Sequence, residues 1–316
     1  MTITLTGRRT NEHFRTDVLA GLSRTKKRLP SKYFYDAAGS QLFDRITELA
    51  EYYPTRTELA IMRQHAGAMA ELCGPQCLLV ELGAGSLVKV RLLLDQLDRP
   101  TGYVPVDVSG SHLRASAKEL DGDYPGLGVY PVVADFMRPF ELPPVPAARR
   151  MVYFPGSTIG NFDRAEADDL LRRIAQLVGP GGGLLLGLDL QKDPTVLEAA
   201  YNDARGVTAA FNLNLLIRIN RELDADFEPL KFRHRAFYNS MRSRIEMHLV
   251  SITEQSVRVG DTTFNFRAGE SIHTENSYKY ELCDLSLRAS ECGLRTDDVW
   301  TDPRSYFAVL HLAAVG

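Results

Sequence analysis

The segment that constrains the fold most is residues 77–86, CLLVELGAGS. Its first six residues form an apolar run interrupted only by Glu81, and Gly83 and Gly85 follow at once. A short apolar run that ends in glycines is typical of a buried strand and a tight turn. Residues 87–98, LVKVRLLLDQLD, have apolar positions at helical spacing. The sequence therefore predicts a strand, a glycine turn and a helix in direct succession.

This alternation of strand and helix patterns continues for about 130 residues. The further predicted strands are 103–109, 127–136, 149–154 with a glycine-bearing loop to 162, and 184–190. The further predicted helices are 57–73, 109–120 and 163–178, the second opened by serine caps and the third by a capping box of Asp163 and Glu166. Alternating strands and helices predict a parallel, doubly wound sheet with helices on both faces. Ligands of such a sheet bind beyond the carboxyl ends of the strands.

The alternation fails after residue 190. A helical stretch follows, and then two strand patterns joined at Gly260-Asp261, which is a hairpin signal. Helix and strand return near the end, where 306–315 suits a last strand of the sheet. We therefore predict a first domain from 57–190 and 281–316, and a second, smaller cap domain from 1–56 and 191–280.

Composition limits the class of protein. The 316 residues are 44% hydrophobic and 24% charged, with a net charge of −3, as in ordinary soluble globular proteins. No long basic block is present, so we expect no nucleic-acid partner. No apolar run reaches the length of a membrane span, and the first residues, MTITLTGRRTNEHF, have no apolar signal core. We expect a cytoplasmic monomer that acts on a small molecule.

Metal-binding patterns are absent from the sequence. Cys73 and Cys77 are close together, but no further ligands follow them at the spacing that zinc sites use. The seven histidines are scattered without an H-x-x-x-H or H-x-x-E pattern. We expect reduced thiols and no metal.

Two classes of nucleotide cofactor compete for the glycine turn. Asp107 lies twenty-two residues beyond Gly85, after the next predicted strand, where a carboxylate suits the hydroxyl pair of a ribose. A dinucleotide requires a third glycine, and Val88 stands at that position. S-adenosylmethionine has no phosphate and needs only a close approach of backbone, with an acid such as Glu81 before the turn. The turn therefore favours S-adenosylmethionine over a dinucleotide.

Asp135 and Phe136, after the third strand, support the same cofactor. The acid suits the amino group of adenine, and the ring suits stacking on the base. The alternative for Asp107 and for Asp135 is a helix N-cap.

The loop after the fourth strand, FPGSTIGNF, contains Gly156 and Asn161. Methyltransferases that act on nucleobases or glutamine usually have N-P-P-[YF] here, and its absence argues against those substrates. Asn161 is a short amide at the expected mouth of the crevice, and its alternative role is a turn or a helix N-cap. We assign Gly156 to the cofactor.

Residues 29–58 contain an unusual number of aromatic side chains before the sheet begins. They are Tyr33, Phe34, Tyr35, Phe43, Tyr52 and Tyr53. Four are tyrosines, which have an apolar body and a polar tip. They suit a polar, aromatic lid over a substrate, and the alternative for each alone is packing in a core or interface.

These motifs together resemble one family. The segments KYFYDAAGSQLFDRIT, EYYPTR, ELGAGS, STIGNF and TENS-x-K are similar to those of the histidine Nα-methyltransferases of ergothioneine biosynthesis, from about residue 12 to the end. The resemblance implies a Rossmann-like class I methyltransferase with a second, smaller α+β substrate domain. It also implies three methylations of the α-amine of L-histidine, which give hercynine.

The resemblance also implies the site residues. With Gly85 and Gly156, which we add, the methyl donor is expected against Gly83, Gly85, Lys89, Asp107, Asp135, Phe136 and Gly156. Histidine is expected against Tyr52, Asn161, Tyr201, Met247, Glu275, Asn276 and Ser277, with Tyr35 and Asn161 at the reacting end. Asn276 departs from the family, which commonly has an aliphatic residue there. Tyr201 and Met247 have ordinary core packing as their alternative.

Glu275 and Ser277 alternate in an extended segment, so their side chains point to one face. A carboxylate and a hydroxyl there suit the two nitrogens of an imidazole. Other functions remain open at this point. They are an α-N-methyltransferase for another amino acid such as tryptophan or a histidine derivative, a nicotinamide-dependent oxidoreductase, and a non-catalytic S-adenosylmethionine sensor.

Overall fold

The computed structural model describes residues 4–85 and 87–315, so the serine that ends the ELGAGS motif lies outside the described residues. The chain divides into two compact units. One unit comprises residues 1–52 and 193–276, and the other comprises residues 53–192 and 277–316. These limits fall within four residues of those predicted from the sequence. The roles of the two units, as cofactor and substrate domains, stay predictions.

The second unit is built on a seven-stranded sheet with the order β11-β12-β5-β4-β1-β2-β3. The strands are β1 (Cys77–Leu82), β2 (Gly102–Asp107), β3 (Val132–Val133), β4 (Arg149–Phe154), β5 (Gly183–Asp189), β11 (Leu294–Thr301) and β12 (Phe307–Ala314). The strands from β1 to β5 pair in parallel, as predicted. The two C-terminal strands are antiparallel, with β12 paired to β5 and β11 paired to β12. The sheet is therefore mixed, because the last two strands are joined without a crossover helix between them.

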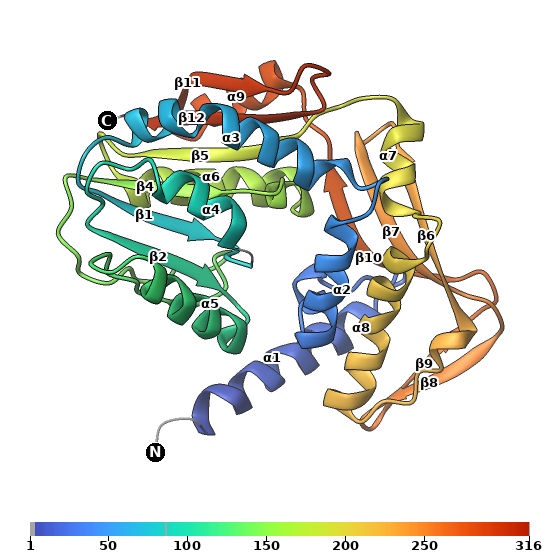
Figure 1. Cartoon of the computed structure of the whole chain (residues 1–316). Helices are drawn as coiled ribbons and strands as arrows, with labels where there is room; N and C mark the ends of the chain where they lie inside the picture. The colour runs from blue at the N-terminus through green and yellow to red at the C-terminus, as the bar shows by residue number, and fades with distance from the viewer. Residues whose placement is uncertain (1–3, 86, 316) are drawn as a thin grey trace. The chain divides into compact units, whose positions relative to one another are not determined.

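Helices cover both faces of this sheet (Figure 1). On one face, α3 (Tyr53–Cys73) and α4 (Leu87–Leu94) pack with α5 (Gly110–Asp123) against side chains such as Leu79 and Tyr103. On the other, α6 (Arg164–Val178) and α9 (Leu282–Glu291) pack against the alternate residues of the same strands. The central strands are buried on both faces, which is why they read as continuous apolar runs in the sequence.

Several local predictions are confirmed and two are wrong. The capping box of Asp163 and Glu166 begins α6, with the Asp163 N–H donating to Glu166 Oε2 at 2.8 Å. The strand predicted over 127–136 shortens to the two residues of β3. The serine cap of α5 is also wrong, because the Ser109 side chain makes no cap hydrogen bond there. Asp107 Oδ1 instead accepts the N–H of Ser109 at 2.7 Å, so an acid organises this turn.

The first unit combines helices with a small antiparallel sheet. Its helices are α1 (Thr4–Leu22), η1 (Ser31–Phe34), α2 (Ala37–Thr47), α7 (Pro194–Tyr201), α8 (Val207–Leu223) and η3 (Pro229–Lys231). Its sheet has the order β10-β7-β6, from β6 (Phe232–Asn239), β7 (Arg244–Ser251) and β10 (Ser271–Tyr278). The strands β8 (Gln255–Val259) and β9 (Thr262–Phe266) form the hairpin predicted at Gly260-Asp261. The last two residues of β10 belong to the second unit.

Helix α8 connects the parts of the first unit. It packs on α2 and on β6 and β7. Asn214 on α8 donates to Asp36 Oδ1 at 2.8 Å, and Asp36 also caps α2 by accepting the N–H of Gly39. The N-terminal segment and the inserted segment thus share one core, although residues 53–192, 140 residues of chain, separate them. No helix among residues 4–85 and 87–315 is long and apolar enough to cross a lipid bilayer.

Candidate active site

The predicted cofactor residues of β1, β2 and β3 come together at the carboxyl ends of neighbouring strands. Leu82 pairs with Val106, and the N–H of Gly83 donates to the Val106 carbonyl at 2.9 Å. Asp107 is therefore the next residue beside the glycine turn. The N–H of Ala134 donates to the Asp107 carbonyl at 3.1 Å, which brings Asp135 to the same edge.

The Gly83 turn has the open backbone surface that a close ligand requires. Gly83 has a φ of +76°, a conformation that favours glycine. Among the described residues, and leaving out the chain neighbours of Gly83, the atom nearest to a Cβ placed there would be Cε1 of Phe136, at 4.0 Å. The ring expected to stack on adenine therefore lies beside the turn expected to receive the cofactor. This arrangement of a bare turn, an acid and a ring fits a nucleoside without phosphates.

Lys89 and Gly156 also lie together. The Lys89 ammonium forms an ion pair with Glu58, a side chain of α3 that is fully buried. Glu58 accepts the N–H of Gly156 at 3.0 and 3.1 Å through its two carboxylate oxygens. A Cβ at Gly156 would lie 3.5 Å from Lys89 Nζ. Glu58 thus holds two predicted cofactor residues in place.

Glu81 is buried directly below the glycine turn. Its carboxyl group accepts a hydrogen bond from the hydroxyl of Tyr103 on β2. Burial raises the pKa of Glu81 to about 8, while the Tyr103 hydroxyl and the Lys89 ammonium act in the opposite direction. A protonated acid in this position holds β1 and β2 together without placing a second negative charge beside Asp107.

The loop that carries Asn161 packs against the last part of β10. Asn161 ends the short helix η2 (Thr158–Asn161), which follows β4. Gly160 is in such close contact that a Cβ there would lie 2.9 Å from the backbone oxygen of Tyr278. Asn161 and Ser277, both expected to contact histidine, are therefore held by two segments of one unit whose backbones touch.

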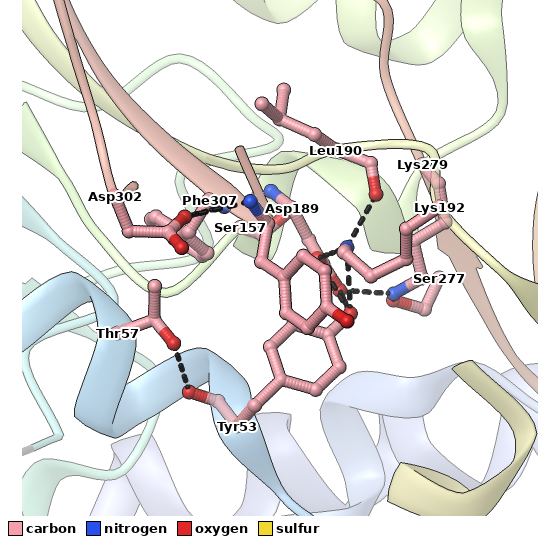
Figure 2. Close-up of polar contacts among 11 residues, drawn as sticks. Tyr53, Thr57, Ser157, Asp189, Leu190, Lys192, Ser277, Lys279, Asp302 and Phe307 are labelled. Carbon is pink, nitrogen blue, oxygen red and sulfur yellow. Dashed lines mark hydrogen bonds and ion pairs between the residues drawn. The ribbon is translucent and has the colours of Figure 1, made fainter. Parts of the chain in front are cut away.

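A cluster of buried charges lies beside these two segments (Figure 2). Asp189, at the end of β5, is 1% exposed, and its carboxylate accepts a hydrogen bond from the ammonium of Lys279 at 2.8 Å. It also accepts the hydroxyl of Tyr53 at 2.7 Å and pairs with Lys192. Burial alone raises the pKa of the Asp189 carboxyl, but Lys279 and Lys192 outweigh it and hold the pKa below its ordinary value. Tyr53, one of the aromatics for which packing was the alternative role, is thus a hydrogen-bond donor.

In the first unit, the predicted tyrosines form a continuous aromatic cluster. Tyr35 meets Phe43 edge to face with centroids 5.6 Å apart, and Phe43 meets Tyr52 at 6.2 Å. Tyr52 in turn meets Tyr201 of α7 at 6.3 Å. Tyr52 and Tyr201 are each 8% exposed, and Tyr35 is half-buried. Phe211 of α8 also contacts Tyr35 and Phe43, so the inserted helix completes the cluster.

The remaining predicted residues belong to the small sheet. Met247 on β7 is 1% exposed, and its carbonyl accepts the Thr274 hydroxyl of β10 at 3.1 Å. Glu275 follows on β10 and is half-buried, whereas Asn276 and Ser277 are buried. The extended conformation predicted for this segment is confirmed, since all three residues lie within the strand.

The same sheet contains a group of side chains of the kind that bind metals. The ligand atoms of Glu246, His248 and His273 lie within 4.8 Å of one another. The rings of His248 and His273, however, stack with centroids 4.8 Å apart and planes at 20°. Stacked rings direct their lone pairs along parallel planes, and Arg244 already occupies one Glu246 oxygen at 2.6 Å. The expectation of no metal stays a prediction.

Cys73 and Cys77 are free thiols, as predicted, and Cys283 and Cys292 are free as well. Cys73 and Cys77 are both buried, and burial raises the pKa of each thiol.

Several residues beside the predicted ones were not found from the sequence. They are Glu58, Phe211, and Asp189 with Lys192 and Lys279. For Lys279 a signal existed, because it is the lysine of the TENS-x-K motif. Glu58 and Asp189 gave none, because a single acid in a helix or strand has no distinctive neighbours in the sequence.

Comparison with known proteins shows to which family this chain belongs. Residues 14–314 match the family model of the histidine-specific, S-adenosylmethionine-dependent methyltransferases. This chain belongs to that family. The histidine-specific family signature thus covers both compact units, including the aromatic segment and the inserted segment.

Named relatives agree with the family. The histidine N-alpha-methyltransferase of Mycolicibacterium smegmatis is 44% identical over 94% of each chain. The enzyme of the same name from Mycobacterium tuberculosis is 45% identical over 95% of this chain and 94% of its own. A more distant relative, a 4-dimethylallyltryptophan N-methyltransferase of Aspergillus fumigatus, is 28% identical over 90% of this chain and 89% of its own.

Proposed function

We propose that the protein transfers three methyl groups in succession from S-adenosylmethionine to the α-amine of L-histidine. The product is hercynine, and the reaction would be the first step of ergothioneine biosynthesis. The observation that carries the proposal is the match to the histidine-specific family over residues 14–314, together with 44–45% identity to two histidine N-alpha-methyltransferases.

The cofactor would be held at the carboxyl edge of the large sheet. Gly83 and Gly85 let it approach the backbone, Asp107 accepts the ribose hydroxyls, and Asp135 with Phe136 receives the adenine. Lys89 and Gly156, organised by Glu58, complete the set. When bound, S-adenosylmethionine supplies a methyl group made electrophilic by its positively charged sulfur. The domain from 57–190 and 281–316 would supply these groups.

Histidine would be held by the residues that the family resemblance implies. Glu275 would accept the N–H of the imidazole and Ser277 would donate to its other nitrogen. Asn276 and Met247 would shape the ring pocket. Tyr52, Asn161 and Tyr201 would hold the end of histidine that carries the carboxylate and the α-amine. The lone pair of the amine would then point to the methyl group of the donor.

The residues at the reacting end mainly position and deprotonate the amine. The α-ammonium must lose a proton before each transfer, and Tyr35 would orient the amine and pass this proton to water. Alignment of the reacting atoms is worth roughly 7–11 kcal/mol in favourable cases. Tyrosine hydroxyls suit an amine that grows bulkier with each methyl better than a fixed carboxylate, which would pair with the ammonium.

The proposal includes a soluble, cytoplasmic monomer that needs no metal and no macromolecular partner. A second candidate is an α-N-methyltransferase for another amino acid such as tryptophan. The 28% identity to a 4-dimethylallyltryptophan N-methyltransferase favours it.

The test is incubation of the protein with S-adenosylmethionine and each of the twenty amino acids, followed by mass spectrometry. Histidine is expected to gain one, two and finally three methyl masses, with fragmentation placing all three on the α-nitrogen. A preference for tryptophan would support the second candidate. A product methylated only on the imidazole ring would refute the α-amine assignment.

A further inference from the structure

One buried side chain of α8 makes hydrogen bonds to all three strands of the small sheet. Asn212 is fully buried, and its Nδ2 lies 2.9 Å from His234 Nδ1 on β6 and 3.2 Å from the His248 carbonyl on β7. Its Oδ1 lies 2.8 Å from the Thr274 hydroxyl on β10. All four residues belong to the first unit, so this asparagine joins the three strands to α8 within one compact unit.

The network continues from β6 to the end of α7. His234 Nε2 lies 2.9 Å from the carbonyl of Tyr201, the last residue of that helix. A carbonyl oxygen can only accept, so Nε2 carries the hydrogen and the neutral ring keeps its lone pair on Nδ1. Burial lowers the pKa of His234, while the Tyr201 carbonyl and Asp203 act in the opposite direction, so the ring is neutral at pH 7.

These contacts fix the orientation of the Asn212 amide. Its two N–H groups donate to His234 Nδ1 and to the His248 carbonyl, and its oxygen accepts the Thr274 hydroxyl. A reversed amide would place its oxygen against two acceptors. The Thr274 hydroxyl also lies 3.1 Å from the Met247 carbonyl, so its single hydrogen is shared between two acceptors. The network from α7 to β10 therefore has one favoured set of hydrogen-bond directions.

The two ends of this network are segments that are expected to hold opposite ends of histidine. Tyr201, whose carbonyl accepts from His234, is expected at the end that carries the carboxylate and the α-amine. Glu275, expected at the imidazole, directly follows Thr274 on β10. A substrate held at both places must match the distance between them. The hydrogen bonds of Asn212 help to set that distance, because they tie the two segments together.

We propose that Asn212 and His234 are positioning residues, which fix the separation of Tyr201 from Glu275 and thereby select the side-chain length of the substrate amino acid. The inference rests on the proposed function, because it takes Tyr201 and Glu275 as contacts of opposite ends of histidine. The intact network holds the site at the length of histidine. A network that lacks one of its bonds binds histidine more weakly and tolerates a longer side chain.

The first experiment compares L-histidine with L-homohistidine, whose side chain is one methylene longer. Mass spectrometry would give kcat and KM for the first methylation of each amino acid by wild type, Thr274→Val and Thr274→Ser. The valine has a shape similar to that of threonine but lacks the hydroxyl, whereas the serine keeps it.

Thr274→Val is expected to raise the KM for histidine about tenfold, because Asn212 loses its donor. It is also expected to lower the ratio of the two kcat/KM values, histidine over homohistidine, about tenfold. Thr274→Ser should restore both quantities to within about threefold of wild type. An unchanged ratio in Thr274→Val would overturn the proposal.

A double-mutant cycle tests whether the network acts through Asn212. His234 and Thr274 contact different atoms of the same amide. The double variant His234→Leu, Thr274→Val should therefore change the ratio little more than the larger of the two single changes. Multiplied effects would overturn the proposal, because the two residues would then act independently. If His234→Leu fails to fold, the comparison of Thr274→Val with Thr274→Ser still decides.

The matched control is Ser251→Ala. Ser251 on β7 is 1% exposed, and its hydroxyl contacts the Thr253 carbonyl and Gln255. The change removes a buried hydroxyl from the same small sheet, so it should lower stability but leave the substrate ratio unchanged. An equal fall of the ratio in Ser251→Ala would overturn the assignment, because any loss of a buried hydroxyl would then have the same effect.

Affinity for S-adenosylhomocysteine separates positioning from general damage. The residues expected to bind the cofactor belong to the other unit, so its Kd in calorimetry should stay within about twofold of wild type in Thr274→Val. A loss of cofactor affinity equal to the loss for histidine would overturn the proposal.

A measurement on the wild type tests the hydrogen-bond directions. Nitrogen NMR of the backbone-assigned protein is expected to show a neutral His234 ring at pH 7 with its proton on Nε2. A proton on Nδ1 would overturn the proposal, because the Asn212 amide would then have to be reversed.

The two levels of failure are distinguishable. Absence of histidine methylation by the wild type would reject the proposed function and this inference together. Histidine methylation with an unchanged ratio in Thr274→Val would reject only the roles of Asn212 and His234.

Discussion

The buried carboxyl group of Glu81 makes the stability of the large sheet depend on pH in a predictable way. Glu81 is 2% exposed, and burial raises its pKa from 4.5 to about 8. In the unfolded chain the same group ionises near 4.5. Between these pH values the unfolded state releases a proton that the folded state retains. The contribution of Glu81 to the free energy of unfolding is therefore fully present below pH 4.5 and is lost as the pH rises towards 8.

The size of the effect follows from the same shift. A difference of about 3.5 between the two pKa values corresponds to about 5 kcal/mol, at about 1.4 kcal/mol for each pKa unit. This is an upper value, because local relaxation and water reduce the penalty of a buried charge. We expect the free energy of unfolding of wild type, relative to Glu81→Gln, to fall by at least about 2 kcal/mol between pH 5 and 8. The glutamine has a similar shape and accepts the Tyr103 hydroxyl through its amide oxygen, but it does not ionise.

The assay is urea denaturation at several pH values, followed by tryptophan fluorescence. The chain has a single tryptophan, Trp300 on β11, which packs against the same core cluster as Leu79 of β1. Fluorescence thus reports on the unit that contains Glu81, even if the two units unfold separately. Glu71→Gln, an exposed position on α3, is the control and should give a flat difference. A flat difference for Glu81→Gln as well would refute the reasoning, because the folded protein would then tolerate the ionised carboxylate.

Two further predictions concern the cofactor edge and its support. Asp107→Ala should weaken S-adenosylhomocysteine binding by about 1–3 kcal/mol in calorimetry, because the ribose hydroxyls would lose their partner. Unchanged affinity would show that the Asp107 side chain organises the turn, where it accepts the N–H of Ser109, and does not bind the ribose. Gly187→Ala should destabilise the protein by about 1–3 kcal/mol, because the new Cβ would lie 2.4 Å from Glu58 Oε1. Gly122→Ala, a helical position with nothing within 4 Å, is its control and should raise the melting temperature slightly; equal melting temperatures for both would contradict the packing argument.

Elements whose signals are local could be predicted from the sequence alone. The apolar run and glycines of residues 77–86 set β1 and its turn, and Asp163 with Glu166 set the beginning of α6. Gly260 and Asp261 set the hairpin of β8 and β9. Each depends on residues within a few positions of one another, so a pattern in the chain is sufficient to detect it. The resemblance of the motifs also led to the family that the comparison shows.

The pairing of distant residues could not be predicted from the sequence and is visible only in the folded structure. The antiparallel placement of β12 beside β5 depends on which sheet edge is open after β5, and strand patterns do not encode direction. Glu58 meets Gly156 across 98 positions, and Lys279 meets Asp189 across 90. A buried charge has no local signature, because its partner is supplied by folding rather than by its neighbours in the chain. For the same reason the sequence does not show that the hydroxyl of Tyr53 donates to Asp189.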